Sequence, residues 1–151
     1  MHENIPNYFD VGIRCATVTQ NINLTAITKT PQGVNSREAM IDTIIDSIRD
    51  IKGQNIVQLD LRKLPDAPTD TFIVCEGESV IQVKSIADRI NYRLKTELGE
   101  YANHVEGSQG SRWYCLDYFD IVIHVFHKEA REFYDLEDLW SDAVTTEYAS
   151  L

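Results

Sequence analysis

Paired cysteines and long apolar runs are both missing from this sequence of 151 residues. Its three cysteines, Cys15, Cys75 and Cys115, are odd in number, widely separated and without a CxxC pair. Such spacing fits reduced thiols in a cytosol better than a disulfide framework or a zinc knuckle. No apolar run approaches the length that crosses a bilayer, and the polar first residues do not resemble a signal peptide. We therefore expect a soluble cytoplasmic protein without a membrane partner.

Positive charge is scarce as well. The sequence carries 24 acidic against 14 basic side chains, which gives a formal net charge of -10. A chain with this balance is repelled by phosphate backbones, so we expect little direct binding to nucleic acid. The length is that of one domain and is sufficient to bury a core without disulfides or metals.

Proline and glycine in "KTPQGVN" separate the start of the chain from the rest. Residues 1–34 are rich in Thr, Asn, Gln and Ile without a sustained period, so we expect a flexible N-terminal arm. An upstream extension and a segment that orders on a partner both remain open for this arm. The pattern that follows predicts one domain over residues 35–144 and a C-terminal tail over residues 145–151.

Helical and strand periods alternate along the predicted domain. One helix has Asn35 as its N-cap and isoleucines at helical spacing, and it ends at Gly53. A second helix opens at Ser79 with a capping box completed by Gln82, and it ends at Gly99. Apolar and alternating runs predict four strands and a final helix, at residues 55–61, 71–76, 112–116, 121–126 and from Lys128 onward. The fold class is therefore α/β, a mixed sheet flanked by helices.

Two histidines near the end of the last predicted strand raise the question of a metal site. His124 and His127 are three residues apart, so on a strand they point to opposite faces and do not share an ion. Further ligands with recognisable spacing are missing around them. We therefore expect His124 to be a half-buried, hydrogen-bonded residue of the strand, and we expect no metal site.

The turn "CEGESV" offers an alternative function as a nucleotide-binding transferase. Gly77 to Ser79 lie between a strand and a helix, where a helix N-terminus favours an anion such as a nucleotide phosphate. Phosphoryl transfer of this kind also needs two carboxylates on one strand face to hold metal ions. Asp117 and Asp120 flank a predicted turn and do not converge, and Asp60 stands alone. A capped helix start without chemistry explains the turn more simply.

The last predicted helix concentrates acidic and aromatic side chains. Six acids lie between residues 129 and 142, against the basic Lys128 and Arg131. This excess suits a docking face for a basic protein. A solvated face kept acidic for solubility explains the segment equally well. Trp113 and Tyr114 point to opposite faces of a strand, so we expect one in the core and the other available as an interface anchor.

Several stretches together resemble a known family. "TDTFIVCEGES", "VKSIADRI", "VEG" and "WYCLDYFDIVIHVFHKEAREFYDLEDLW" follow one another in this order. The last is the most specific, because it combines D-x-x-D, a strand histidine, R-x-x-Y-x-L-E and a terminal tryptophan. From about residue 38 to residue 142 the chain thus resembles the ribosomal silencing factor family, also called Iojap-like proteins.

The resemblance implies a translational repressor that is not an enzyme and uses no cofactor. Members of this family bind the large ribosomal subunit through ribosomal protein L-fourteen and sterically block its association with the small subunit. The resemblance also implies homodimers, negative regulation of ribosome biogenesis, and a fold similar to a nucleotidyltransferase core without the catalytic carboxylates. No part of this extends to the arm before residue 35, which has no counterpart in the family.

Six residues of the matching stretches are predicted to bind the partner: Trp113, Asp117, His124, Arg131, Tyr134 and Glu137. The two aromatic residues serve as anchors, the two acids face basic side chains, and the histidine and arginine orient the surface. The motif residues Asp120 and Leu136 are expected to hold the turn and the core instead. Phe119 departs from the family, which commonly has Gly in this hairpin turn. Because positive φ strains a phenylalanine, we expect this hairpin to adopt another turn type.

Overall fold

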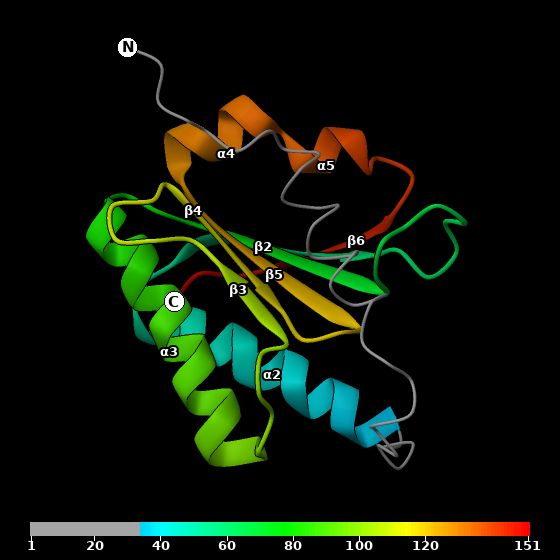
Figure 1. The fold of residues 1–151 in the computed structure, drawn as a ribbon. Helices are drawn as coiled ribbons and strands as arrows, with labels where there is room; N and C mark the ends of the chain where they lie inside the picture. The colour runs from blue at the N-terminus through cyan, green and yellow to red at the C-terminus, as the bar shows by residue number, and fades with distance from the viewer. Residues whose placement is uncertain (1–33) are drawn as a thin grey trace.

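The computed structural model describes residues 34–151, so nearly all of the expected arm, residues 1–34, lies outside the described residues. The described helices and strands build one sheet with helices on both faces (Figure 1). The described elements are α2 (Val34–Asp50), β1 (Gln54–Asp60), β2 (Thr71–Gly77), α3 (Val80–Leu98), β3 (His104–Glu106), β4 (Trp113–Asp117), β5 (Ile121–His127), α4 (Lys128–Tyr134), α5 (Leu136–Leu139) and β6 (Val144–Tyr148). None of the helices within this range is both long and apolar enough to span a membrane.

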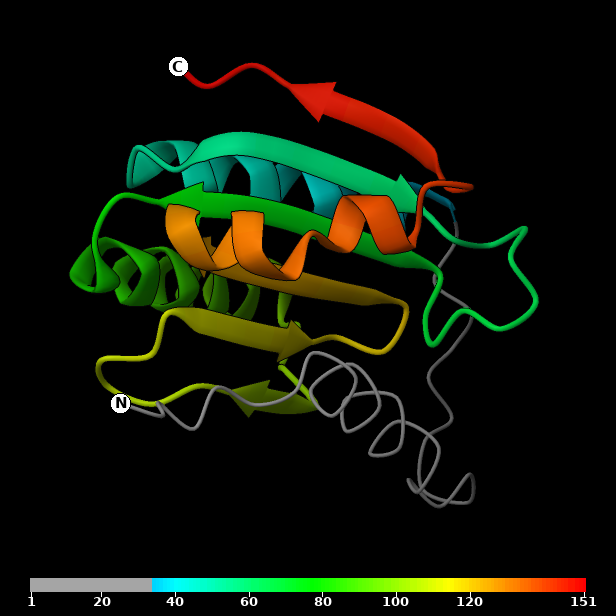
Figure 2. The same cartoon turned by 90° about the horizontal axis from the view of Figure 1, so that it is seen from above.

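The strands form one six-stranded mixed sheet in the order β3-β4-β5-β2-β1-β6. The central strands β2 and β5 are parallel, with Thr71 opposite Ile121 and Gly77 opposite His127. All other neighbouring strands are antiparallel. Because β2 and β5 end at the same edge of the sheet, α3 and α4 start close to that edge. They then pack on opposite faces, with α2 and α3 behind the sheet and α4 and α5 in front of it (Figure 2).

Helices α2 and α3 cover their face of the sheet with aliphatic side chains. Ile44 and Ile48 of α2, and Ile86 and Ile90 of α3, are completely buried in one cluster with Ile73 of the sheet. These positions recur at the helical period, so each helix presents one apolar stripe to the sheet. Each fully buried aliphatic side chain contributes about 1.5–3 kcal/mol to folding.

The opposite face is covered by two short helices over an aromatic core. Its buried cluster includes Phe72, Trp113 and Phe126 of the sheet together with Ala130 of α4 and Leu136 of α5. α4 has 7 residues and α5 has 4. Helices this short depend on packing for their stability, because an isolated helix of such length is not stable in water.

The structure confirms the predicted fold class and the predicted elements as far as α4. The Ser79 hydroxyl accepts a hydrogen bond from the backbone N–H of Gln82. Gly99 ends α3 with a φ of 65°. At the N-terminal end of α3, the Gln82 side chain also accepts a hydrogen bond from the backbone N–H of Glu78, the residue before the N-cap. The first helix begins at Val34 and ends at Asp50, slightly earlier than predicted.

Two strands and one helix break differ from the sequence-based expectations. β3 is too short to show a period, and four of the five residues of β6 are exposed, so neither has the apolar pattern of a strand. β6 nevertheless pairs with β1 along its whole length. The segment expected as a tail from residue 145 therefore belongs largely to the sheet. The last helix is interrupted at Asp135, whose φ of 46° ends α4 before α5 begins.

The hairpin between β4 and β5 keeps positive φ at Phe119, contrary to our expectation of another turn type. Its φ is 69°, in the left-handed region that favours glycine. Two hydrogen bonds hold this conformation. The Asp117 Oδ1 atom accepts from Phe119 N at 2.8 Å, and the Thr69 hydroxyl donates to the Phe119 carbonyl at 2.8 Å. The turn therefore keeps the strained backbone conformation at Phe119, and these two hydrogen bonds offset the strain.

Candidate functional site

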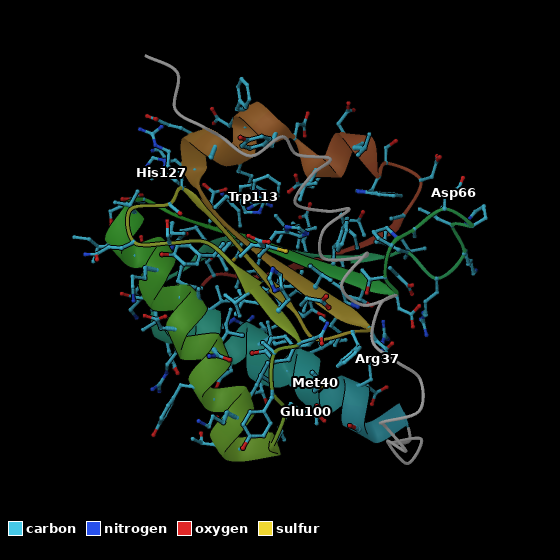
Figure 3. All side chains as sticks on the ribbon, in the orientation of Figure 1. Arg37, Met40, Asp66, Glu100, Trp113 and His127 are labelled. Atoms are coloured by element: carbon cyan, nitrogen blue, oxygen red, sulfur yellow. The ribbon has the colours of Figure 1, made fainter. Side chains whose placement is uncertain are left out.

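Trp113 is the centre of an aromatic cluster between the sheet and α4. It opens β4 and lies beneath α4 (Figure 3). Its ring centroid is 4.8 Å from that of Phe126 and 4.8 Å from that of Tyr134. Only 8% of Trp113 is exposed. The predicted anchor is thus largely buried, and it supports the surface above it more than it forms that surface. Tyr114 is also buried, on the opposite face of β4, so neither residue of the pair is freely exposed.

His124 holds Trp113 from the neighbouring strand. The Trp113 Nε1–H donates a hydrogen bond to His124 Nδ1 at 3.1 Å. Because Nδ1 accepts, this bond requires a neutral ring that carries its proton on Nε2. Burial lowers the pKa of His124 to about 3, and the ring is only 1% exposed. Phe72 meets it edge-on at 4.7 Å between ring centroids. His124 therefore occupies the place of an orienting residue behind Trp113 and has no surface of its own.

Above the aromatic cluster, α4 presents an exposed phenylalanine. Phe133 is 76% exposed, and its ring meets Tyr134 edge-on at 5.1 Å between centroids. One turn earlier, the Glu129 carboxylate lies 3.5 Å from the guanidinium of Arg112, the residue before β4. We call this surface the partner face, defined by Arg112, Glu129, Phe133 and Tyr134. It combines an apolar centre with a charged rim, as protein interfaces commonly do.

Arg131 lies on the other flank of α4 and ties three elements together. It donates to the backbone carbonyl of Asn55 at 2.5 Å, and it pairs with Glu76 at 3.1 Å and with Glu137 at 2.5 Å. Its side chain is 11% exposed. Arg131 thus faces the fold and positions Glu137, whose own side chain is 29% exposed. A guanidinium is suited to this role because its planar donors serve several acceptors at once.

Asp117 does not join the other predicted residues. It ends β4, opposite Val122 of β5, whereas Trp113 begins β4 opposite Phe126. The side chain is completely buried, and its Oδ1 atom holds the hairpin turn through Phe119 N. Asp117 therefore supports the turn, and its contact with a partner stays a prediction. The D-x-x-D spacing is as typical of a turn as of a docking acid.

The turn from Gly77 to Ser79 uses its polar groups internally. The Glu78 N–H donates to Gln82 Oε1 at 2.8 Å, and the Ser79 hydroxyl accepts from the Gln82 N–H at 3.1 Å. The Glu78 carbonyl is hydrogen-bonded to His127 Nε2 at 3.1 Å. A phosphate at this turn would have to compete for these groups and would also meet the Glu78 carboxylate.

His127 and His124 have separate environments. His127 caps α4 through Nδ1, which accepts from the Glu129 N–H at 3.3 Å, while His124 is buried below. Within residues 34–151, no group of three or more His, Cys, Asp or Glu side chains is arranged to hold a metal ion. Burial raises the pKa of the Cys75 thiol to about 12, so this cysteine is not an activated nucleophile.

Phe133 and Phe72 were missed as site residues by sequence reasoning. Phe133 lies within α4, and its side chain is 76% exposed, whereas Ala130 is the buried residue of this helix. Phe72 belongs to a largely apolar strand, and only the β2–β5 pairing places it next to His124. No local signal in the sequence distinguishes either residue from an ordinary core position.

The geometry defines a mixed α/β domain whose candidate site is a surface of aromatic and charged side chains. A family model described as "Ribosomal silencing factor during starvation" matches residues 34–151. A protein of Halalkalibacterium halodurans named ribosomal silencing factor RsfS is 34% identical over 112 residues, which is 74% of this chain and 94% of that protein. One of Bacillus subtilis with the same name is 38% identical over 62% of this chain and 78% of its own length.

Solved structures agree with these relatives. A crystal structure of a protein from Chromobacterium violaceum matches with a TM-score of 0.64 and 35% identity, over 69% of this chain and 85% of that one. The chain therefore belongs to the ribosomal silencing factor family. The matched range includes β6, so the family domain extends beyond residue 144.

Proposed function

We propose that this protein represses translation by binding the large ribosomal subunit through ribosomal protein L-fourteen. Membership of the ribosomal silencing factor family supports this function. The observation that carries it is the partner face, where a phenylalanine 76% exposed sits above a rigid aromatic cluster. Phe133 and the partly exposed Tyr134 together give this face an aromatic centre with a charged rim, and aromatic side chains are enriched at protein interfaces.

The mechanism is steric. A folded domain that occupies part of the intersubunit surface of the large subunit must leave before the small subunit joins. No bond is made or broken in this process, so the protein acts without catalysis and without a cofactor. The acids of α4 and α5 suit a basic ribosomal protein, and the net charge of -10 opposes the approach of ribosomal RNA. We further propose that the protein is cytoplasmic and forms homodimers.

The test is gradient sedimentation of purified ribosomal subunits, mixed with and without the protein at one magnesium concentration. We expect a smaller joined-ribosome peak and comigration of the protein with the large subunit. Isolated L-fourteen should bind the protein in calorimetry. An unchanged joined peak, with the protein at the top of the gradient, would refute the proposed function.

A second titration distinguishes the proposed function from the nucleotide-binding alternative. If the turn from Gly77 to Ser79 binds nucleotide, then magnesium and a nucleoside triphosphate should give heat with the wild-type protein and none with Ser79→Ala. Because the polar groups of this turn are already hydrogen-bonded, we expect no heat with either protein. A magnesium-dependent signal lost in Ser79→Ala would favour the alternative.

A further inference from the structure

Within the part of the chain that the structure describes, β6 is the last strand at one edge of the sheet. It follows β1 in the strand order, and among residues 34–151 no strand is paired with its other side. Figure 2 shows β6 as the outermost strand on this side of the sheet. Every second residue of an edge strand points its N–H and C=O outward, where a further strand is able to pair with them.

The edge is regular and firmly held. Five consecutive residues pair with β1, from Tyr148 opposite Ile56 to Val144 opposite Asp60, without a register shift. The Tyr148 hydroxyl donates to Gln58 Oε1 at 2.6 Å, and Arg49 Nε donates to the carbonyl of Ala149 at 3.0 Å. A strand fixed in this way loses little conformational entropy when another segment binds beside it.

The features that commonly protect an edge strand are few in β6. Its sequence, VTTEY, has no proline and no lysine, and Glu147 supplies its single charge. Three of its residues are β-branched, which favours an extended backbone. At the opposite edge of the sheet, β3 has only 3 residues. Of the two edges, β6 is therefore the one suited to accept another strand.

An acidic groove lies beside this edge. It has a volume of about 670 Å³ and lies between β1, β6 and the end of α4. We call it the β6 groove, and its charged lining residues are Glu76, Arg131, Glu132, Asp135, Glu137 and Glu147. Five carboxylates thus face one guanidinium, and Arg131 is already paired with two of them. The excess negative charge favours a positively charged occupant.

The strand register indicates how such an occupant would lie. Glu147 is opposite Val57 and Thr145 is opposite Leu59. Val57 and Leu59 belong to the core under α4 and α5, so Glu147 and Thr145 point to the same face as the groove. A segment added beyond β6 would direct alternate side chains toward this face. Long basic side chains at these positions reach the groove acids.

We propose that the outer edge of β6 binds an extended, lysine- or arginine-rich segment of a partner protein by strand addition. The segment pairs its backbone with β6 and places its basic side chains in the β6 groove. Backbone pairing supplies affinity, and the groove supplies specificity for basic sequences. The outer edge of β6 is separate from the partner face, which lies on the other flank of α4. The groove acids Glu132 and Glu137 also belong to the α4–α5 acids proposed to face L-fourteen, so the test uses peptides and no ribosomal protein.

The test uses the full chain and a peptide of the length of β6 in which lysine alternates with valine and threonine. Two control peptides are matched to it. One has glutamate in place of every lysine, and the other keeps the lysines but carries N-methyl groups on alternate backbone amides, so one edge has no donors. Binding is followed by calorimetry and by amide hydrogen exchange of β6.

We expect the lysine peptide to bind and to slow exchange at alternate amides of β6, and we expect neither control peptide to do so. The double variant Glu132→Lys with Glu147→Lys should weaken binding about tenfold or more. The control double variant Glu129→Lys with Asp66→Lys carries the same change of net charge at two residues that do not line the β6 groove, and it should bind like the wild type.

Three outcomes would overturn the proposal. Equal binding of the N-methylated peptide would show that charge alone attracts it. Unchanged binding by the double variant would exclude the β6 groove. Protection of β6 that rises with protein concentration in the absence of peptide would show that a second copy of the chain occupies the edge. None of these results bears on subunit sedimentation, so the proposed function is tested separately.

Discussion

The two faces of the sheet are built in different ways. Under α2 and α3 the core is almost entirely aliphatic, and these helices have 17 and 19 residues. Under α4 and α5 the core holds Trp113, Phe126 and the buried His124, and these helices have 7 and 4 residues. The long helices bury a continuous apolar stripe against the sheet, although α3 exposes Ile81 and Tyr92 on its outer side. The short helices leave Phe133 exposed and a groove open beside β6.

This difference suggests that the α2–α3 face serves mainly to stabilise the fold, whereas the α4–α5 face also serves to bind a partner. Long amphipathic helices bury a complete apolar stripe and need no partner. Short helices over a large aromatic core leave edges and rings that another protein is able to cover. We therefore expect changes on the α2–α3 face to alter folding alone, and changes on the α4–α5 face to alter binding as well.

The largest effect is expected from truncation of one core residue on each face. Trp113→Ala should lower the free energy of unfolding by about 3–5 kcal/mol, and Ile48→Ala should lower it by about 2–5 kcal/mol, since both side chains are buried. Denaturant unfolding measures both values. Per folded molecule, only Trp113→Ala should lose affinity for the large subunit, because it removes the support of Tyr134. Equal losses of affinity would contradict the separation of the two faces.

The next effect is a pH dependence specific to the α4–α5 face. The folded-state pKa of His124 is about 3, below its ordinary value of 6.5, because burial disfavours the charged ring. The His124 ring is protonated at a higher pH in the unfolded chain than in the folded one. The stability that the neutral ring contributes is therefore fully present above pH 6.5, and it is lost as the pH decreases. The loss is about 1.4 kcal/mol per pH unit.

Unfolding of the wild type and of His124→Gln should be compared between pH 6.5 and 5, above the range in which most carboxylates titrate. The variant should be less stable at pH 6.5, and its stability should fall less steeply with decreasing pH. Ile48→Val, destabilised on the other face, should keep the wild-type slope. A His124→Gln protein with the wild-type slope would show that the ring is not held neutral.

The aliphatic face was predictable from the sequence because its signals are local. Isoleucines at helical spacing, the capping box at Ser79 and the stop at Gly99 determine each helix within its own segment. β6 lacked such a signal, since it pairs with a strand far away in the sequence and has mostly exposed residues. Edge strands are stabilised by pairing more than by pattern, so a period-based prediction misses them.

The candidate site was only partly predictable for a similar reason. The resemblance to the family predicted Trp113, His124 and Tyr134 as site residues, and the structure brings these three together in one cluster. The same reasoning placed Asp117 with them, although its side chain is buried in the hairpin turn. Sequence order indicates which strand carries a residue. It does not indicate which end of that strand meets a given helix, since that depends on the pairing of β4 with β5.

A smaller effect is expected from two equally exposed apolar side chains on opposite faces. Phe133 on α4 is 76% exposed, and Ile81 on α3 is 77% exposed. Either residue changed to alanine should alter stability by less than about 0.5 kcal/mol, because little area is buried. Phe133→Ala should weaken binding to the large subunit about tenfold or more, and Ile81→Ala should leave it unchanged. Cosedimentation titrations measure both affinities, and a stronger loss with Ile81→Ala would move the partner face to α3.

The smallest effect is expected at the β4–β5 turn, which lies at the other end of β4 from Trp113 and the partner face. Phe119 has a φ of 69°, so a side chain there costs about 1 kcal/mol that glycine does not. Phe119→Gly relieves this strain but gives the unfolded chain more freedom, so we expect a net gain below about 1 kcal/mol. Thermal unfolding measures the gain, and subunit binding should not change. A loss of stability would show that the contacts of the Phe119 ring outweigh the backbone strain, and that the phenylalanine is retained for packing in this turn.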